Sequence, residues 1–365
     1  MSATAANREF ESIQADPTAT PEDVAWDAFL AAHPFGHHEQ SSVYGQLRKS
    51  YGFETERVVL HRQGRIVGGA QVLWRRTPIG RIAVVKRGPL ARDDDPAVIS
   101  ELVQQLDKLA QRRKFAIQRV ETFMPQQTAR EALAAHGFEP RQSWGSIQPS
   151  VMIRLDGDDD GLLARMTHKG RYNIRRAERF GVEVRIGDAG TLGDFYQLHA
   201  NSADHQDFAI FDRSYFEYLL EVFGPSGHVQ QFIAYHRDQP VAALFNTIVG
   251  DYMLYGWGGI DRGDEARKLM ANYLLHFQAM SWARKYGCKY YDMVGISEQT
   301  MSGLTQFKTR IAPERIRWPA TMWKFYGPLA PLRSLATEVT WARSTLRSPV
   351  LRAARRLGLR PQMPW

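Results

Sequence analysis

The sequence predicts a mixed α/β (α+β) protein made of two similar units, each a mixed and mostly antiparallel sheet flanked by helices. Two observations predict this fold. First, the order of strand, turn and helix patterns in residues 57–123 returns in residues 231–294, and such a repeat indicates a duplicated unit. Second, a chain of 365 residues is too long for one typical domain and suits two domains of ordinary size.

Each unit contains the pattern of a β-hairpin. Residues 57–74 read RVVLHRQGRIVGGAQVLW, in which two apolar runs flank a polar turn at residues 62–65. Residues 231–248 read QFIAYHRDQPVAALFNTI and repeat the apolar run, the His-Arg turn and the second apolar run. Short runs rich in β-branched residues on either side of a polar turn are typical of antiparallel strand pairs. A hairpin is therefore expected at both places.

A helix followed by a strand comes next in each unit. Residues 102–123 have a helical pattern that ends in basic residues and then a strand pattern, and residues 274–294 do the same. The pairs Lys114-Phe115 and Lys285-Tyr286 are expected to mark the same passage from helix to strand.

The repeats also predict the domain boundaries. The first domain is expected at residues 1–147 together with about 318–345, because the pattern of the second unit is complete by Ile316. The second domain is expected at residues 148–317, after a junction near Gly145 to Pro149. Residues 346–365 remain as a basic tail.

The composition excludes several classes of protein. No apolar run approaches the roughly 18 residues that span a bilayer, and the polar N-terminus has no apolar core like that of a signal peptide. We therefore expect a cytoplasmic protein. The single cysteine, Cys288, excludes an internal disulfide and a multi-cysteine metal site.

The positive charge gathers at the C-terminal end. Residues 331–365 hold seven arginines and one acid, Glu338, so this tail carries +6 of the formal net charge of +8. Its leucines, valines and Trp341 alternate with the arginines, and Pro349 divides the segment. Such a stretch can lie on an anionic membrane or contact RNA phosphates. The alternative is a final helix packed on the first domain and a solvated basic end.

A second basic segment, residues 162–180 (LLARMTHKGRYNIRRAERF), has the pattern of one amphipathic helix. Its apolar residues, three or four positions apart, are Leu163, Met166, Gly170, Ile174 and Ala177. Six cations stand against the single acid Glu178. Like charges four residues apart repel each other, so a helix with Arg171, Arg175 and Arg179 on one face is expected to meet an anion, such as the phosphates of a nucleotide or of RNA. The alternative is a solvated helix surface.

Six short segments along residues 33–330 carry a resemblance to a known family. They are Gln40-Ser41 with Tyr44-Gly45 and Arg48, the turn at 87–90 (RGPL), the basic segment 162–180, residues 208–219, the strand pattern 252–256, and the ordered set Tyr291-Asp292, Gly295-Ile296 and 303–308 (GLTQFK). Together they resemble the Fem family of aminoacyltransferases, which carry two tandem GCN5-related acyltransferase-like domains. Residues 150–317 contain no charged heptad run long enough for the coiled-coil arm of some family members, so no arm is expected.

The resemblance implies roles for individual residues. Arg48 stands where the family usually has a lysine that contacts the sugar-nucleotide portion of the precursor. The other residues implied to bind substrate are Tyr44, Lys169, Arg171, Arg175, Arg213, Tyr215 (with Tyr218 as its competitor), Tyr252 and Tyr255. Phe307 and Lys308 are implied to lie at the channel where the peptide bond forms. Asp292 is a candidate general base by position only, with a structural carboxylate at a strand end as the alternative.

The resemblance implies transfer of an amino acid from aminoacyl-tRNA to the amino group of a peptidoglycan precursor, nucleotide-linked or lipid-linked. The ester of a charged tRNA is already activated, so neither a cofactor nor a metal is expected. A lipid-linked acceptor would bring the protein to the inner face of the cytoplasmic membrane, with a peripheral contact through residues 331–365.

Three other functions stay open. An acyl-CoA-dependent N-acyltransferase is disfavoured because the stretch 261–267 has one glycine and three acids, which would repel the cofactor pyrophosphate. A second alternative is a Fem-like transferase that acts on another cell-surface polysaccharide or lipid. A non-catalytic adaptor would bind RNA or membrane through the tail.

Overall fold

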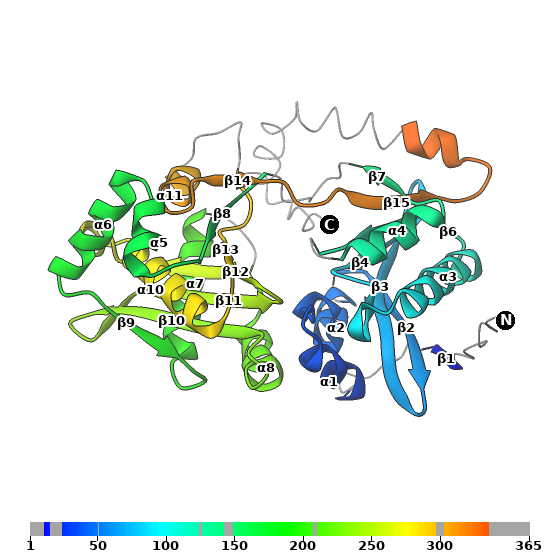
Figure 1. The fold of residues 1–365 in the computed structure, drawn as a ribbon, viewed down its shortest axis with the longest axis horizontal. Helices are drawn as coiled ribbons and strands as arrows, with labels where there is room; N and C mark the ends of the chain where they lie inside the picture. The colour runs from blue at the N-terminus through cyan, green and yellow to red at the C-terminus, as the bar shows by residue number, and fades with distance from the viewer. Residues whose placement is uncertain are drawn as a thin grey trace, which may run out of the picture. The chain divides into compact units, whose positions relative to one another are not determined.

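The computed structural model describes residues 11–14, 24–49, 51–123, 126–141, 149–206, 210–296 and 303–335. The chain divides into two compact units (Figure 1). Unit 1 comprises residues 1–33, 38–146 and 319–365, and unit 2 comprises residues 34–37 and 147–318. The expected basic tail at 346–365 lies outside the described residues.

The sheet of unit 1 is antiparallel except at one place. Its strands follow the order β1 (Glu11–Gln14), β2 (Glu54–Arg62), β3 (Arg65–Thr77), β4 (Gly80–Lys86), β6 (Phe115–Glu121), β15 (Thr321–Phe325) and β7 (Glu139–Arg141), and β5 (Leu90–Ala91) pairs with β3. Strands β4 and β6 are parallel. Strand β15, which comes after unit 2 in the sequence, pairs with both β6 and β7 and returns the chain to the first sheet.

Helices α1 (Val24–Ala32), α2 (Ser42–Lys49), α3 (Pro96–Arg113) and α4 (Gln127–Ala135) complete unit 1, with short 3₁₀ turns at His38–Gln40 and Arg92–Asp94. Helix α3 makes the crossover from β4 to the parallel strand β6. The carboxylate of Asp95 accepts a hydrogen bond from the Ala97 amide at its start, as a favourable N-cap does. Leu102 and Leu106 of α3 pack on Val72 of β3 in the core of this unit.

Unit 2 repeats this plan. Its strands follow the order β14 (Glu314–Ile316), β8 (Ser150–Arg154), β13 (Tyr290–Asp292), β12 (Tyr252–Ile260), β11 (Gln239–Val249), β10 (Val229–His236) and β9 (Glu183–Gly187). All neighbours are antiparallel except β12 and β13. The helices are α5 (Asp159–Arg165), α6 (His168–Arg179), α7 (Leu192–Gln206), α8 (Arg213–Phe223), α9 (Asp264–Leu269), α10 (Ala271–Tyr286) and α11 (Gly303–Ile311).

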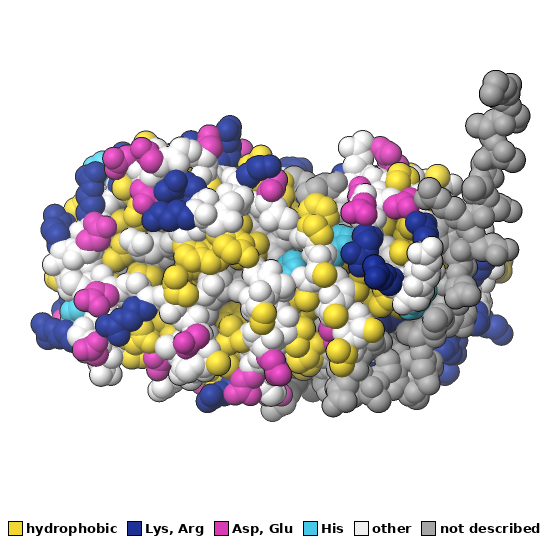
Figure 2. Space-filling model, turned by 60° about the horizontal axis from the view of Figure 1, so that its bottom comes forward, with side chains coloured by type: hydrophobic (Ala, Val, Ile, Leu, Met, Phe, Trp, Pro, Cys, Tyr) yellow, Lys and Arg dark blue, Asp and Glu magenta, His cyan; other side chains and the backbone are white. Residues whose placement is uncertain are grey.

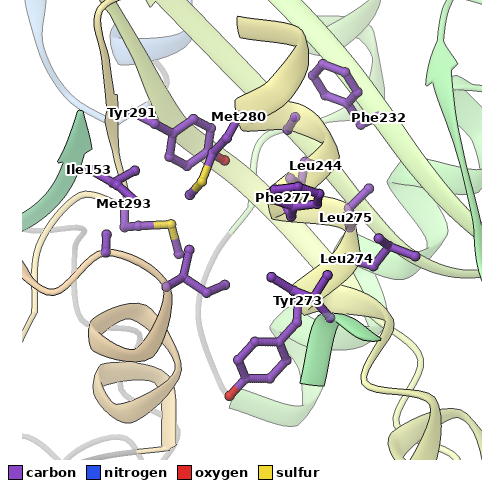
Figure 3. Packing of buried hydrophobic residues seen from close by; sticks show 14 of the residues in the cluster. Ile153, Phe232, Leu244, Tyr273, Leu274, Leu275, Phe277, Met280, Tyr291 and Met293 are labelled. Carbon is purple, nitrogen blue, oxygen red and sulfur yellow. The ribbon is translucent and has the colours of Figure 1, made fainter. Parts of the chain in front are cut away.

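Helices cover both faces of the second sheet. Leu244 of β11 joins Leu275 and Phe277 of α10 in the main core (Figure 3). The next residue, Phe245, points to the opposite face, where its ring lies 5.3 Å from that of Phe195 on α7. Neighbouring residues of a strand alternate between faces, so each strand of this sheet contributes to two layers of packing.

The predicted fold class is confirmed, and so are both hairpins and both helix-to-strand passages. The predicted equivalence of Lys114-Phe115 and Lys285-Tyr286 is wrong. Lys114 caps α3 in a left-handed conformation and Phe115 begins β6, whereas Lys285 and Tyr286 still belong to α10. Gly287, with a φ of +109°, ends α10 in their place, because glycine adopts this conformation without strain.

The prediction of one helix over 162–180 is also wrong, because the structure has two. Helix α5 begins at Asp159, where Asp158 accepts a hydrogen bond from the Gly161 amide. The chain then turns at Met166, and Thr167 starts α6 by accepting from the Gly170 amide. Two side-chain caps within nine residues favour two short helices over one long one.

Within the described residues, no helix is long and apolar enough to cross a membrane, and no group of His, Cys, Asp and Glu is suited to hold a metal ion. The longest helix described is α3, with 18 residues. Cys288 is free and buried. On the face of the molecule in Figure 2, groups of Lys and Arg side chains alternate with groups of Asp and Glu.

Candidate functional site

The ammonium group of Lys308 is held inside unit 2 by backbone carbonyls. Lys308 lies on α11 and is only 6% exposed. Its Nζ donates to the carbonyl oxygens of Val294 at 3.3 Å and Gly295 at 3.0 Å, in the loop that leaves β13. Gly303, which begins α11, stands only eight positions beyond Gly295 in the sequence. Helix α11 therefore places Lys308 next to the end of β13, the strand that precedes it in the chain.

Lys308 and its neighbour Phe307 both contact aromatic rings. Lys308 Nζ lies 5.5 Å from the ring centroid of Tyr255 on β12, within the range of a cation–π contact. The ring of Phe307 packs at 4.9 Å on Tyr273 and at 5.2 Å on His276, both of α10. Three of the residues named from the sequence, Phe307, Lys308 and Tyr255, are thus brought together.

Burial makes Lys308 an unusual lysine. Removal from water lowers its pKa to about 8, because a buried site disfavours the charged form. The carboxylate of Asp292 opposes this effect and raises the pKa. Near neutral pH the side chain is therefore a cation that loses its proton far more easily than an ordinary lysine.

Asp292 ends β13 with its carboxylate fully engaged in hydrogen bonds. It accepts from the Ser150 hydroxyl of β8, from the Val294 amide at 2.7 Å and from the Trp318 indole at 2.9 Å. The residue is completely buried. Its contacts hold the end of β13 and the loop that supplies the carbonyls to Lys308. This geometry suits a positioning role better than that of a general base, whose oxygen must reach the substrate.

A chain of polar side chains lies beneath Lys308 and was missed from the sequence. His276 of α10 is fully buried, and its Nδ1 lies 2.8 Å from the Tyr291 hydroxyl of β13. The Tyr291 oxygen also accepts from Asn246 Nδ2 at 3.3 Å. Figure 3 shows Tyr291 beside the apolar residues of α10. The only sequence signal was a histidine within an otherwise apolar run, at 274–277.

The Tyr291 hydroxyl therefore joins His276 and Asn246 in one buried chain of polar side chains. Burial and the nearby Lys308 cation lower the pKa of His276 to about 3, so it stays neutral. His276 Nε2 has no hydrogen-bond partner among the described residues.

Tyr252 lies away from Lys308. It is on the same strand as Tyr255, and an interval of three residues puts the two side chains on opposite faces. The ring of Tyr252 stacks on Tyr290 at 4.9 Å and lies 6.0 Å from Trp318. Tyr252 thus belongs to the layer of Asp292 and Trp318, and only Tyr255 adjoins Lys308.

The basic residues of α6 fall into two groups. Lys169 and Arg175 are exposed, and Lys169 lies 5.1 Å from the exposed ring of Tyr172. Arg171 instead is half-buried and donates to the carbonyl oxygen of Met166, where the chain turns between α5 and α6. Only the exposed group is free to meet an external anion.

Arg213 and Tyr215 point in different directions from α8. Arg213 is exposed and forms an ion pair of 2.9 Å with Glu217, one turn along the helix. Tyr215 is buried, with its ring 4.6 Å from Phe211 and 6.3 Å from Trp257. Its competitor Tyr218 is partly exposed. The structure does not bring Arg213 and Tyr215 together in one group.

Arg48 and Tyr44 lie on α2 of unit 1. Arg48 is only 6% exposed, and its guanidinium carbon lies 4.4 Å from the ring centroid of Phe53 and 5.9 Å from that of Tyr44. Its Nε has no hydrogen-bond partner among the described residues. The Tyr44 hydroxyl donates to Glu39 at 3.4 Å, and burial raises the pKa of Tyr44.

The two repeated units, each with one parallel strand pair and a crossover helix, define a tandem protein of the GNAT type. Residues 164–309, which include Lys308, match the model of the acetyltransferase (GNAT) domain. Residues 22–230 match the model of the FemAB family. Because that match covers more than half of the 365 residues, the chain belongs to the FemAB family.

Similar proteins include lipid II:glycine glycyltransferases of staphylococci. The protein of Staphylococcus epidermidis is 25% identical over 232 residues, which cover 60% of this chain and 56% of the relative. That of Staphylococcus aureus is 24% identical over 219 residues, with 57% and 52% covered. The chain thus spans about half the length of the curated relatives it matches.

Solved structures share the fold. A crystal structure of FemX has a TM-score of 0.67 at 17% identity and covers 90% of this chain and 100% of its own. The C-terminal domain of a putative lysylphosphatidylglycerol synthetase from Agrobacterium fabrum has a TM-score of 0.54 at 14% identity, with 86% and 96% covered.

Proposed function

We propose that this protein is an acyltransferase that moves an amino acid from aminoacyl-tRNA to the amino group of a peptidoglycan precursor stem peptide. The observation that carries the proposal is the buried Lys308 ammonium group, held by two carbonyls of the loop after β13 and bordered by Tyr255. Membership of the FemAB family and the names of the staphylococcal relatives support the class of reaction.

Lys308 has one hydrogen left for the reaction. An ammonium group has three N–H donors, and the carbonyls of Val294 and Gly295 accept two of them. Among the described residues, the third has no acceptor. The acceptor amine attacks the ester carbonyl carbon, and the resulting oxyanion takes this third hydrogen bond. A donor in this position typically contributes about 10²–10³ in rate.

The proton and the leaving group follow from the chemistry of the ester. When the tetrahedral intermediate collapses, the carbonyl carbon loses its bond to the ribose oxygen of the tRNA. The amine nitrogen gives up a proton, and the departing ribose oxygen takes one to become a hydroxyl. In this proposal Asp292 has a positioning role, because the three hydrogen bonds that it accepts hold the loop whose carbonyls bind Lys308.

The binding residues fit two anionic substrates. Arg48, buried against aromatic rings in unit 1, would contact the precursor. Lys169 and Arg175 on α6 would contact phosphates of the tRNA. A lipid-linked acceptor, as named for the staphylococcal relatives, would place the reaction at the inner face of the cytoplasmic membrane.

An acyl-CoA-dependent N-acyltransferase is the second candidate, because the GNAT domain model matches residues 164–309. The segments that would cradle the cofactor pyrophosphate oppose it. Helix α9, which follows β12, carries Asp264 and Glu265 in its first turn. In unit 1, Asp93 and Asp94 precede α3. Carboxylates at these positions would repel a pyrophosphate.

The test is transfer of labelled amino acids from a mixture of charged tRNAs to nucleotide-linked and lipid-linked stem pentapeptides. We expect transfer by the natural protein and a loss of about 10²–10³ in rate for Lys308→Ala. The matched control is Lys289→Ala, which removes an exposed lysine of the same unit. No transfer to either acceptor, together with acetyl-CoA binding, would replace this proposal with the acyl-CoA one. Tight RNA or vesicle binding without any transfer would favour an adaptor.

A further inference from the structure

The segment that follows β15 is docked on unit 1 with its polar side inward. Residues 330–335 form the short orange helix after β15 in Figure 1. Arg333 donates from Nε to the Ile79 carbonyl at 3.1 Å and from Nη1 to the Tyr326 carbonyl at 2.8 Å. The neighbouring Ser334 accepts from Arg141 at 2.7 Å. The polar residues Arg333 and Ser334 therefore attach this short helix to unit 1.

Its apolar residues face outward instead. Leu329, Leu332 and Leu335 are spaced three apart, and their exposed fractions are 50%, 65% and 58%. A surface helix normally buries its apolar side and exposes its polar side. The arrangement here is reversed, and three adjacent leucines in water are costly unless a partner covers them.

A hairpin tip extends the same surface. The turn between β3 and β4 exposes Pro78 and Ile79, and the Ile79 side chain is 38% exposed. The hydrogen bond from Arg333 to the Ile79 carbonyl joins the tip to the leucine segment. Arg76, near the end of β3, is also exposed. The result is an apolar patch, made of Leu329, Leu332, Leu335 and Ile79, with a basic residue at its edge.

The charge of the residues that follow the patch in the sequence indicates which kind of partner fits it. Residues 336–365 follow Leu335 directly and contain six arginines and one acid, Glu338. An apolar patch that continues into a basic segment matches an anionic lipid surface, which takes leucines into its acyl boundary and attracts arginines. A second copy of this chain is a poorer match, because a symmetric contact would bring two such basic segments together.

We propose that this patch is a membrane-docking surface, on which Leu329, Leu332, Leu335 and Ile79 enter the interface of an anionic bilayer. This surface goes beyond the transfer reaction, and its test requires no substrate. Docking would hold the enzyme beside a lipid-linked acceptor.

The first experiment is co-sedimentation of the full chain with vesicles of phosphatidylglycerol and phosphatidylcholine, and with vesicles of phosphatidylcholine alone. The patch variant combines Leu329→Gln, Leu332→Gln and Leu335→Gln. The control is Ile186→Gln, which removes an equally exposed apolar side chain (59%) from β9 of unit 2. We expect the natural chain to bind the anionic vesicles, the patch variant to lose at least about tenfold in partition, and the control to be unchanged. Circular dichroism checks the folding of each variant.

A fluorescent label attached through Leu332→Cys, in a Cys288→Ser background, reports what covers the patch. A blue shift that appears only with anionic vesicles, and that weakens with salt, supports docking. The proposal fails if the natural chain does not bind vesicles, or if the patch variant binds as well as the natural chain. It also fails if the shift appears without vesicles, since residues 336–365 or a second copy would then be the occupant. Transfer to a nucleotide-linked acceptor, measured on the same variants, tests the proposed function separately.

Discussion

The indole nitrogen of Trp318 donates a hydrogen bond of 2.9 Å to Oδ2 of Asp292. This contact joins the last residue of unit 2 to the end of β13. Asp292 also accepts from the Ser150 hydroxyl and the Val294 amide, so one carboxylate ties together β8, β13 and the loop that holds Lys308.

We expect Asp292→Asn to lower the free energy of unfolding by about 2–4 kcal/mol, because a buried carboxylate accepts all three hydrogen bonds. Urea unfolding measures this loss. Trp318→Phe is the matched control, since it removes one donor and keeps the carboxylate. If Asp292 only positions the loop, both variants lose activity in proportion to their loss of stability. A well-folded Asp292→Asn without turnover, beside a nearly normal Trp318→Phe, would instead identify a general base.

Lys308→Met is expected to separate activity from stability. The substitution removes the proposed oxyanion donor and should lower the transfer rate by about 10²–10³. It also removes a buried cation whose pKa is lowered by burial, so the unfolding free energy should rise by roughly 1–3 kcal/mol. Lys289→Met, at an exposed position, should change neither quantity much. A stability loss in Lys308→Met would contradict this account of the lysine.

The transfer rate is expected to fall as the pH rises through about 8, where Lys308 loses its proton. Stability should change in the opposite direction. An unfolded lysine keeps its proton up to about pH 10.4, so the unfolded chain binds more protons between pH 8 and that value. The unfolding free energy therefore rises with pH across this window. Lys308→Met should remove this part of the pH dependence, which denaturation at several pH values measures.

Tyr291→Phe is expected to cost more stability than His276→Phe. The Tyr291 hydroxyl serves both His276 Nδ1 and Asn246 Nδ2, so its loss leaves two buried groups unpaired, at about 1–3 kcal/mol. His276→Phe keeps an aromatic ring and also removes Nε2, which has no partner among the described residues. Its cost should stay below about 1 kcal/mol. Equal losses, measured by thermal unfolding, would show that Nε2 has an ordered partner.

The exposed arginines of α6 are expected to contact RNA. Arg175→Gln with Arg179→Gln should weaken tRNA binding and reduce its salt dependence, by about one unit of log–log slope for each lost contact. Arg176→Gln is the control, because the Nε of Arg176 donates to the Lys268 carbonyl at 2.9 Å within the protein. Filter binding at several salt concentrations measures both. An equal effect of the control would point to a general charge effect instead of a phosphate-binding face.

Local patterns carried most of the fold prediction. The turn at Gln63-Gly64 and the apolar runs of β10 and β11 are short-range features, so both hairpins were predictable. The division of residues 159–179 into two helices depended on the caps Asp158 and Thr167. Those residues are visible in the sequence, but the apolar spacing across them favoured a continuous helix.

The candidate site was predictable only in part. Phe307, Lys308 and Tyr255 came from a family resemblance, and the structure brings them together. The same resemblance suggested Arg213 and Tyr215 as a pair, but one faces solvent and the other joins an aromatic core. His276 carried no motif, so the sequence offered no reason to place it beside Phe307.

The sequence by itself determined the two repeated units and the opposite orientations of Tyr252 and Tyr255, because the period of a strand fixes which side chains share a face. Tertiary structure decided which groups meet. The carbonyls that hold Lys308, the Ser150 and Trp318 donors to Asp292 and the tyrosine beneath His276 lie between 13 and 142 residues away from their partners in the sequence. Such contacts depend on how the sheet and helices pack, and no local pattern encodes the distance between them.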